Sequence, residues 1–328
     1  MTMILGIDQG ASHTRAAVCD LDGNILARAR SDGAVHSFDG MERAMQGVHD
    51  AAHAALDQAG VQTHDVAIVY AGMTGADWRD EYDLLRENVT RLGLGDTVHI
   101  ANDCIIAMRG GTSQRYGAIL IAGTGGNCAV RAPGGEEMIF HFYQEGELQG
   151  GTALGYRVLN AIYRAETGRE PPTRLRARVL AMFNFTTVDD LLRAHVERRL
   201  DGNRVKDIAP PLFEIALEGD LVASRIIESF GGGLAELVVA GFSRLGMLPL
   251  DAEVVLSGSI FRAPGDLLKD VIAARIHLHA PRARIVSARY EPVVGALLLG
   301  LEAYGSSVTE AVMHNVERSS QRLGLLRV

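Results

Sequence analysis

The sequence predicts an α/β protein of two duplicated domains, each a mixed five-stranded sheet with helices on both faces. Two observations lead to this fold class. First, an apolar run, a turn with glycine and hydroxyl residues and a second apolar run occur over residues 4–20, and the same order returns over residues 117–131. Second, strands that alternate with helices follow this hairpin in both halves. A repeated arrangement of this kind is typical of a duplicated domain.

Hydrophobic periodicity and turn residues predict the elements of the first half. Apolar runs separated by tight turns predict three antiparallel strands within residues 3–30. Apolar residues on one helical face predict a helix over 39–59. A continuous apolar run at 66–71 is typical of a strand that is buried on both faces. The remaining expected elements are a helix over 77–92 and a strand over 97–100.

The second half repeats this plan with a helical insertion over about residues 150–245. Within it, Gly231-Gly232-Gly233 would destabilise a free helix by about 1 kcal/mol per glycine, so we expect a kink or very close packing there. The elements expected after the insertion are a strand at 252–256, a helix near 264–274, a strand at 284–288, a helix at 293–303 and an amphipathic helix at 308–322.

The overall charge argues against several classes of partner. A net charge of −8 and a pI of about 5.8, without a basic run, disfavour nucleic acid or an acidic membrane as the main partner. The longest late apolar stretch, residues 293–301, is too short to span a bilayer. The chain begins with a strand and shows no leader pattern, so we expect a cytoplasmic protein.

The cysteines and lysines limit the chemistry further. Cys19, Cys104 and Cys128 stand singly, so we expect buried thiols instead of a disulfide or metal framework. The only lysines, Lys206 and Lys269, lie in no glycine-rich phosphate loop. If the protein binds ATP, backbone amides and a metal ion must therefore neutralise the phosphates.

The tip of the first hairpin suits a phosphate. Gly10 lets the backbone approach an anion closely, and the amides from Ala11 to Thr14 can point inward. Ser12 and Thr14 add hydroxyl donors. Asp8 would repel a bare phosphate, but it becomes useful when Mg²⁺ bridges the two. The alternative is an ordinary polar turn, and the second hairpin favours the phosphate site over it.

Four stretches together resemble a known family. The first hairpin resembles the phosphate-1 loop of the sugar kinase/actin/heat-shock-chaperone superfamily, and Gly123-Thr124-Gly125-Gly126-Asn127 resembles its phosphate-2 loop. Leu256-Ser257-Gly258-Ser259-Ile260-Phe261 resembles its adenosine loop. With Ala101-Asn102-Asp103 at a strand end, the chain most resembles the N-acetylglucosamine kinase branch of the BadF/BadG/BcrA/BcrD ATPase family over about residues 3–300.

The resemblance implies a fold and an activity. The fold would be two actin-like (ribonuclease H-like) domains with an ATP cleft between them. The N-terminal domain would span residues 1–115 and be completed by a C-terminal helix at 306–325, and the C-terminal domain would span 116–305. The implied activity is transfer of the γ-phosphoryl group of ATP, with Mg²⁺, to a hydroxyl of an amino sugar of the N-acetylglucosamine or glucosamine type. The implied partners are ATP and the sugar, and a homodimer is a possible assembly.

The resemblance also assigns residues. Asp103 would be the general base that takes the proton of the sugar hydroxyl, although Asp at this position is also a common helix cap. Asp8 would hold Mg²⁺. The residues assigned to the ATP phosphates are Gly10, Ser12, His13, Thr14, Gly123, Thr124 and Gly125, and those assigned to adenosine are Gly258 and Ser259. The residues assigned to the sugar are His36, Thr74, Asn102, Asp103, Gly125, Asn127 and Glu147.

The sugar region departs from the family pattern. Gly151 and Thr152 stand where the N-acetylglucosamine kinases carry an acidic pair, and Glu145 or Glu147 could replace it. In the loop where an asparagine is expected to reach the sugar, this chain offers His36 and a neighbouring serine. Two alternative functions follow. One is an ATPase that activates a partner enzyme, and the other is a non-catalytic sugar or nucleotide sensor.

Overall fold

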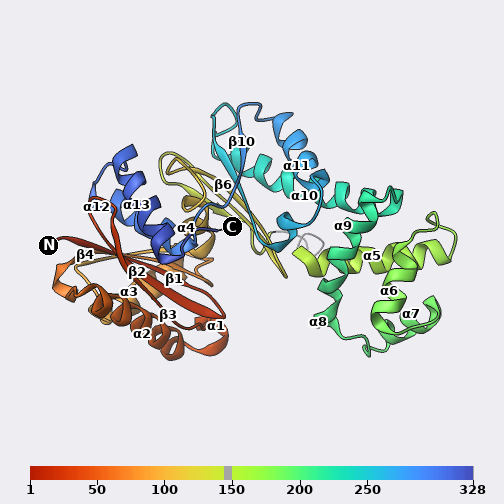
Figure 1. Ribbon diagram of the computed structural model, residues 1–328, viewed down its shortest axis with the longest axis horizontal. Helices are drawn as coiled ribbons and strands as arrows, with labels where there is room; N and C mark the ends of the chain where they lie inside the picture. The colour runs from red at the N-terminus through yellow and green to blue at the C-terminus, as the bar shows by residue number, and fades with distance from the viewer. Residues whose placement is uncertain (144–149, 328) are drawn as a thin grey trace. The chain divides into compact units, whose positions relative to one another are not determined.

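The computed structural model of the protein describes residues 1–143 and 150–327, which form two compact units. Unit 1 consists of Met1–Gly117, Pro133–Glu137 and Val286–Val328. Unit 2 consists of Ala118–Ala132 and Met138–Ile285. The chain forms two five-stranded sheets, so the predicted fold class is confirmed. Figure 1 shows the strands together with the helices of each half of the chain.

The sheet of unit 1 has the strand order β3-β2-β1-β4-β5. Strands β1, β2 and β3 are antiparallel neighbours, whereas β4 runs parallel to β1 and β5 parallel to β4. The carboxyl ends of these three parallel strands therefore meet at one edge of the sheet, where such sheets place ligands. The strands are β1 Met3–Gln9, β2 His13–Asp20, β3 Ile25–Asp32, β4 Val66–Met73 and β5 Thr97–Asn102. The helices of unit 1 are α1 His36–Asp39, α2 Met41–Ala59, a 3-10 turn Thr63–Asp65, α3 Arg79–Arg91, α4 Asp103–Arg109, α12 Pro292–Tyr304 and α13 Glu310–Leu323.

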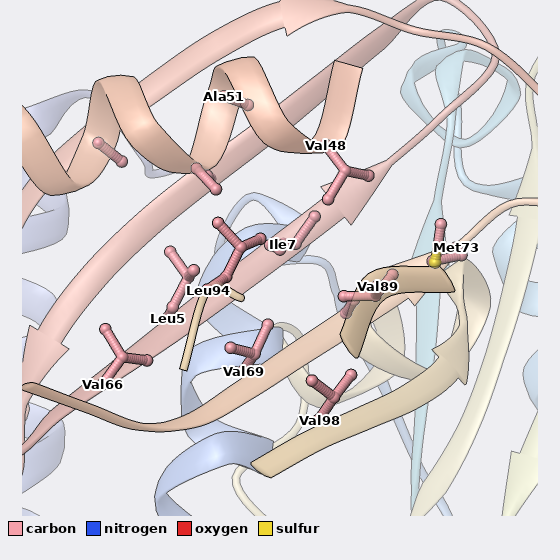
Figure 2. Packing of buried hydrophobic residues seen from close by; sticks show 14 of the residues in the cluster. Leu5, Ile7, Val48, Ala51, Val66, Val69, Met73, Val89, Leu94 and Val98 are labelled. Atoms are coloured by element: carbon pink, nitrogen blue, oxygen red, sulfur yellow. The ribbon is translucent and has the colours of Figure 1, made fainter. Parts of the chain in front are cut away.

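A hydrophobic core fills the space between this sheet and α2. Strand β1 is buried along its whole length, as expected for the central strand of a covered sheet. Figure 2 shows Leu5 and Ile7 of β1 in one cluster with Val48 of α2 and Val69 of β4. In β2, Ala16 belongs to the same cluster and so points to the α2 face of the sheet. The residues on either side of Ala16 point to the opposite face, because side chains alternate along a strand.

Helix α12 covers that opposite face, which corrects the predicted domain boundary at residue 305. The helix packs against β1, β4 and α4. A Cβ at Gly6 of β1 would lie 2.9 Å from the Leu297 nitrogen, and a Cβ at Gly295 would lie 1.8 Å from the Ile106 oxygen of α4. Only glycine fits at such close backbone approaches. Residues 286–305 therefore belong to unit 1. Their prediction as part of the second domain, together with the strand that precedes them, is wrong.

The C-terminal helix α13 lies against β3 of unit 1. The Ser319 hydroxyl accepts a hydrogen bond from the Ile25 amide at 3.0 Å, and Arg322 Nη2 donates to the Ile25 carbonyl at 2.7 Å. Beyond the helix, the Glu291 amide donates to the Leu325 carbonyl at 2.9 Å. The end of the chain is thereby fixed to the residue that precedes α12.

A buried ion pair joins α4 to α12, and we predict that unit 1 depends on it for stability. Arg109 is 1 % exposed, and its Nε and Nη2 donate to Glu302 Oε1 at 3.0 and 2.8 Å. Removing one partner strands a charge, so Arg109→Met is expected to lower the free energy of unfolding by about 3–5 kcal/mol. Replacing both residues by methionine should recover much of this loss in urea unfolding. A double variant as unstable as the single one would contradict the prediction.

The second sheet has the order β10-β9-β6-β7-β8. Read from the other edge, this is the third, second, first, fourth and fifth strand of the second half, the same order as in unit 1. This shared order confirms that the domain is duplicated. Its strands are β6 Gly117–Ala122, β7 Gly126–Arg131, β8 Glu137–Ile139, β9 Glu253–Ser257 and β10 Arg284–Ser287.

The helical insertion lies between β8 and β9 (green in Figure 1). Its helices are α5 Gly150–Glu166, α6 Leu175–Phe183, α7 Val188–Val196, α8 Gly202–Val205, a 3-10 turn Lys206–Ile208, α9 Ala209–Leu217 and α10 Leu221–Arg244, and β9 is followed by a 3-10 turn Ser259–Arg262 and α11 Leu267–His277. Helix α10 is continuous through its three glycines. A Cβ at Gly231 would lie 3.1 Å from Leu268 Cδ1 and from Val271 Cγ1, so close packing against α11 explains this glycine. Among the described residues α10 alone is long and apolar enough to cross a membrane, but half of its apolar window is buried within the protein.

Candidate functional site

The phosphate-1 hairpin presents an exposed turn between β1 and β2. The Gly10 amide donates to the His13 carbonyl at 3.0 Å, and the Ser12 carbonyl accepts from the Gly33 amide at 3.2 Å. A Cβ at Gly33 would lie 2.3 Å from the Gly10 oxygen, so the chain after β3 packs directly under the turn. Within the described residues the amides of Ala11 and Ser12 donate to no backbone acceptor. These two exposed amides and the Ser12 hydroxyl can bind an anion.

The predicted phosphate contact of Thr14 is wrong. Thr14 is 0 % exposed, and its hydroxyl lies where a Cβ at Gly47 of α2 would be 3.2 Å away. Alternation along β2 turns this side chain toward the α2 face of the sheet, beside Ala16, where no ligand can reach it. The sequence showed a hydroxyl two residues past the turn, but not the face of the strand on which this hydroxyl lies.

Asp8 is the last residue but one of β1, and its carboxylate is nearly buried, with 7 % of the residue exposed. Its Oδ2 lies 3.5 Å from Arg15 Nη1, a long ion pair that compensates little of the cost of burial. Burial is the main cause that raises the pKa of Asp8 to about 7, Arg15 and Arg327 oppose the shift, and the nearby Asp103 and Glu291 reinforce it. A carboxylate in such surroundings favours a cation beside it.

The surroundings of Asp8 fit Mg²⁺. In the described part of the chain, no three His, Cys, Asp or Glu side chains form a group that could hold a metal ion. Mg²⁺ keeps several waters and is commonly bound through one or two carboxylates together with substrate phosphates. One buried aspartate next to exposed turn amides therefore suits an ion that arrives with a nucleotide, and it does not suit a cage made of protein ligands alone.

Asp103 is the first residue of α4 and lies at the carboxyl end of β5. Its Oδ2 accepts a hydrogen bond of 2.6 Å from the Thr74 hydroxyl, which follows β4 directly. The helix cap is Asn102, whose side chain accepts from the Cys104 amide at 2.9 Å. Since Asn102 caps the helix, the carboxylate of Asp103 is available for another role.

The same geometry excludes the predicted sugar contact of Asn102. This residue is 1 % exposed, and its Nδ2 donates to the Ala76 carbonyl at 3.0 Å and to Asp77 Oδ1 at 2.9 Å. Both ends of the amide are therefore occupied within the protein. Asn102 fixes the start of α4 and the loop after β4, and with them the position of Asp103.

His36 lies in the short helix α1, against the loop after β4. A Cβ at Gly75 would lie 3.0 Å from His36 Cε1, and His36 Nε2 lies 3.8 Å from Glu81 Oε1. Only 8 % of the His36 side chain is exposed, which leaves little of it for a sugar. Two residues away from His36, Phe38 is 88 % exposed, and Trp78, the last residue of the loop after β4, is 47 % exposed.

The phosphate-2 turn of unit 2 is held by the start of α5. The Gly123 amide donates to the Gly125 carbonyl at 2.8 Å, and the Gly151 amide donates to the Gly123 carbonyl at 2.7 Å. The amide and hydroxyl of Thr152 both donate to the Thr124 carbonyl, at 3.2 and 3.1 Å. Gly151 and Thr152, which break the family's acidic pattern, therefore brace the turn that is predicted to bind phosphate.

We predict that Gly150→Ala distorts this turn. Gly150 has φ +59°, and a Cβ there would lie 2.2 Å from the Gly125 oxygen, a backbone contact that no rotamer relieves. Strain of this kind costs about 1–3 kcal/mol, so lower stability and weaker ATP binding are expected in urea unfolding and nucleotide titration. Gly232→Ala in α10 is the control, because its Cβ meets no atom within 4 Å and should stabilise the helix by up to about 1 kcal/mol. Equal behaviour of the two variants would contradict the prediction.

A cavity of about 400 Å³ in unit 2 brings the phosphate-2 turn together with the predicted adenosine loop. Gly258, with φ +114°, lies so close to β6 that a Cβ would be 2.2 Å from the Ala122 oxygen, and Ser259 follows at the cavity wall. The other lining residues are Gly123, Thr124, Gly151, Lys206, Asp207, Ala209, Pro210, Phe213, Ile260, Arg262, Ala263 and Pro264. Apolar walls with a few polar groups are typical of a site for a small organic ligand.

The model of the BadF/BadG/BcrA/BcrD ATPase family matches residues 5–300. The chain belongs to this family.

Two curated relatives match this chain along nearly their whole length. The N-acetyl-D-glucosamine kinase of Dictyostelium discoideum is 26 % identical, over 92 % of this chain and 98 % of its own. The N-acetylmuramic acid/N-acetylglucosamine kinase of Clostridium acetobutylicum is 22 % identical, over 91 % of this chain and 98 % of its own.

Solved structures share the fold of this family member. A provisionally named N-acetylglucosamine kinase from Chromobacterium violaceum aligns with a TM-score of 0.62 and 19 % identity, over 91 % of this chain and 99 % of its own. A ROK family glucokinase from Streptomyces griseus, solved with glucose and AMPPNP, aligns with a TM-score of 0.52 and 20 % identity, over 92 % and 99 % of the two chains. These likenesses support the two-domain sugar-kinase fold.

Some residues of the candidate site were not predicted from the sequence, and two predicted glutamates lie outside the described residues. Lys206 and Phe213 line the cavity although they lie in the helical insertion, far from any loop motif. Asn127 Oδ1 accepts from the Cys128 amide at 2.8 Å, within the strand that follows the turn. Glu147, together with Glu145, lies outside the described residues.

Proposed function

We propose that the protein is an ATP-dependent kinase that transfers the γ-phosphoryl group to a hydroxyl of an amino sugar of the N-acetylglucosamine type. The observation that carries the proposal is the partly exposed carboxylate of Asp103 at the strand edge, where Thr74 orients it and Asn102 performs the capping. Family membership and the activities named for the two curated relatives support it.

Each part of the proposed site has a distinct task. In unit 1, the amides of Ala11 and Ser12 would bind phosphate oxygens, and Asp8 would hold Mg²⁺. Bound there, the ion would neutralise developing charge on the phosphates. Asp103 would accept the proton of the attacking hydroxyl, and a carboxylate suffices because phosphoryl transfer depends mainly on positioning and charge neutralisation.

In unit 2, the turn at Thr124 and Gly125 would contact phosphate and sugar oxygens, and the cavity beside Ser259 would take the adenosine. The apolar surface of Phe213 and Ile260 suits the faces of a purine, and the Ser259 hydroxyl suits a ribose. We propose a cytoplasmic location for the enzyme.

A coupled assay of ADP release with the full chain, MgATP and a panel of sugars tests this function. The panel consists of N-acetylglucosamine, glucosamine, N-acetylmannosamine, N-acetylmuramate and glucose. Turnover that depends on an amino sugar is the expected result. ATP binding without release of ADP for any sugar would contradict a kinase and point to a sensor. The three cysteines are buried thiols, which does not favour an activator ATPase that holds an iron–sulfur cluster.

A further inference from the structure

Three charged residues form a row across the first three strands of unit 1. Asp8 of β1 is the register partner of Arg15 of β2, and Arg15 is the register partner of Arg30 of β3. Register partners in antiparallel strands point to the same face of the sheet. The row therefore places two guanidinium groups side by side, next to the carboxylate that is proposed to hold Mg²⁺.

Two like charges directly opposite one another destabilise a sheet, and little in this structure offsets the repulsion. Arg15 reaches Asp8 only at 3.5 Å, and its side chain stays 32 % exposed. Among the described residues no carboxylate lies within ion-pair distance of Arg30. Arginines elsewhere in the chain do find such partners, for example Arg174 with Glu218 at 2.7 Å. The pair of Arg15 and Arg30 is therefore short of negative charge.

The contact that Arg30 does make orients it toward the phosphate-1 turn. Arg30 Nη2 lies 2.8 Å from His13 Nδ1 and 2.6 Å from His13 Nε2, and His13 is the first residue after the turn. A guanidinium only donates hydrogen bonds, so this contact favours a neutral imidazole, in which one of the two ring nitrogens accepts. Desolvation, and after it the charges of Arg30 and Arg15, lower the pKa of His13, in agreement with a neutral ring beside both guanidiniums.

The absence of lysine from unit 1 gives these arginines particular importance. Both lysines of the chain, Lys206 and Lys269, lie in unit 2. Without a lysine in a phosphate loop, backbone amides and a metal ion were the groups expected to neutralise the phosphates. Arginine suits phosphate recognition well, because its planar group donates two parallel hydrogen bonds and keeps its charge.

We propose that Arg30, together with its cross-strand partner Arg15, binds the anionic oxygens of the nucleotide's phosphate chain, and that His13 positions Arg30 for this contact. The inference deepens the proposed kinase function and rests on it. An anion between the two guanidiniums would offset their repulsion and lie beside the exposed amides of Ala11 and Ser12. The pair would thus supply fixed positive charge beside the phosphate-1 turn, in a unit that contains no lysine.

Calorimetric titration of the full chain with inorganic tripolyphosphate tests the proposal, since this probe carries the phosphate chain without a nucleoside. Arg30→Gln is expected to weaken binding by about 10-fold or more, because one charge-assisted hydrogen bond contributes about 1.5–3 kcal/mol. Arg30→Lys should restore part of the affinity. Arg28→Gln is the matched control, because Arg28 lies two residues earlier on the same strand, is exposed, and has Ala17 as its register partner.

Thermal unfolding without ligand separates binding from folding. Arg30→Gln removes one of two like charges that face each other. Its melting temperature without ligand should therefore be unchanged or higher, while its stabilisation by tripolyphosphate falls. The proposal is overturned if Arg30→Gln binds tripolyphosphate as tightly as Arg28→Gln does, or if the unaltered chain does not bind it. ADP release with a sugar by an Arg30→Gln enzyme of unchanged tripolyphosphate affinity would overturn this inference alone. Arg30-dependent binding without ADP release for any sugar would support it and contradict the kinase.

Discussion

Asp103→Asn is expected to lower kcat by about 10²- to 10⁴-fold, the usual contribution of a general base, while the affinity for ATP changes little. Asparagine keeps an oxygen that can accept from the Thr74 hydroxyl, which lies 2.6 Å from Asp103 Oδ2 in the structure. The start of α4 is also preserved, because Asn102 and not Asp103 caps the helix. The variant therefore loses the proton acceptor and little else.

Single-turnover and steady-state ADP release with the best sugar of the panel measure this effect. Asp80→Asn is the matched control, since Asp80 is likewise an acidic residue in the first turn of a helix, α3, but is exposed. It should keep nearly full activity. If Asp103→Asn retained turnover within a few-fold of the unaltered enzyme, another group would have to take the proton. A loss of ATP affinity equal to the loss of kcat would indicate a disturbed fold instead of a missing base.

The repeated hairpin made the fold predictable, because a glycine turn between two apolar runs is a local signal that tertiary packing does not override. The packing of α12 in unit 1, although it follows the strands of unit 2 in the chain, was not predictable in this way. Its placement depends on Gly6 and Gly295, which let backbones approach, and a glycine in a sequence does not name its neighbour. Neighbours in the chain are the default expectation for packing, and here that expectation was wrong.

The site was predicted to the level of the loop, but less well to the level of the side chain. The turns at residues 10–12 and 123–125 were identified by composition, yet Thr14 turns into the core and Asn102 is consumed by capping. The first outcome depends on the face of the strand to which Thr14 points, and the second on the position of Asn102 at the cap of α4. Thr152 shows the converse, because a residue that departs from the family pattern holds the phosphate-2 turn through its own hydroxyl.

Asp8→Asn is expected to abolish most Mg²⁺-dependent turnover and, in metal-free protein, to increase stability at high pH. The folded state raises the pKa of Asp8 from 3.8 to about 7, mainly through burial. The folded protein thus holds a proton that the unfolded chain releases near pH 4. Stability from this group is fully present below that pH and is lost as the pH rises toward 7. Each pKa unit corresponds to about 1.4 kcal/mol, so the asparagine variant should gain on the order of 4 kcal/mol relative to the unaltered protein at pH 8.

Urea unfolding in EDTA at pH 5 and pH 8 measures this gain, which should be larger at pH 8. Asp22→Asn is the control, because Asp22 lies in the exposed turn that follows β2, at the end of the strand far from Asp8. The gain in stability at pH 8 should be absent from this variant. Adding MgATP should reverse the order, because a bound cation stabilises the ionised carboxylate and has no such partner in the variant. A stability difference that is independent of pH, or equal stabilisation of both proteins by MgATP, would mean that Asp8 is a structural residue. In that case the cation of the nucleotide would have to be held by water and phosphate without the first domain's carboxylate.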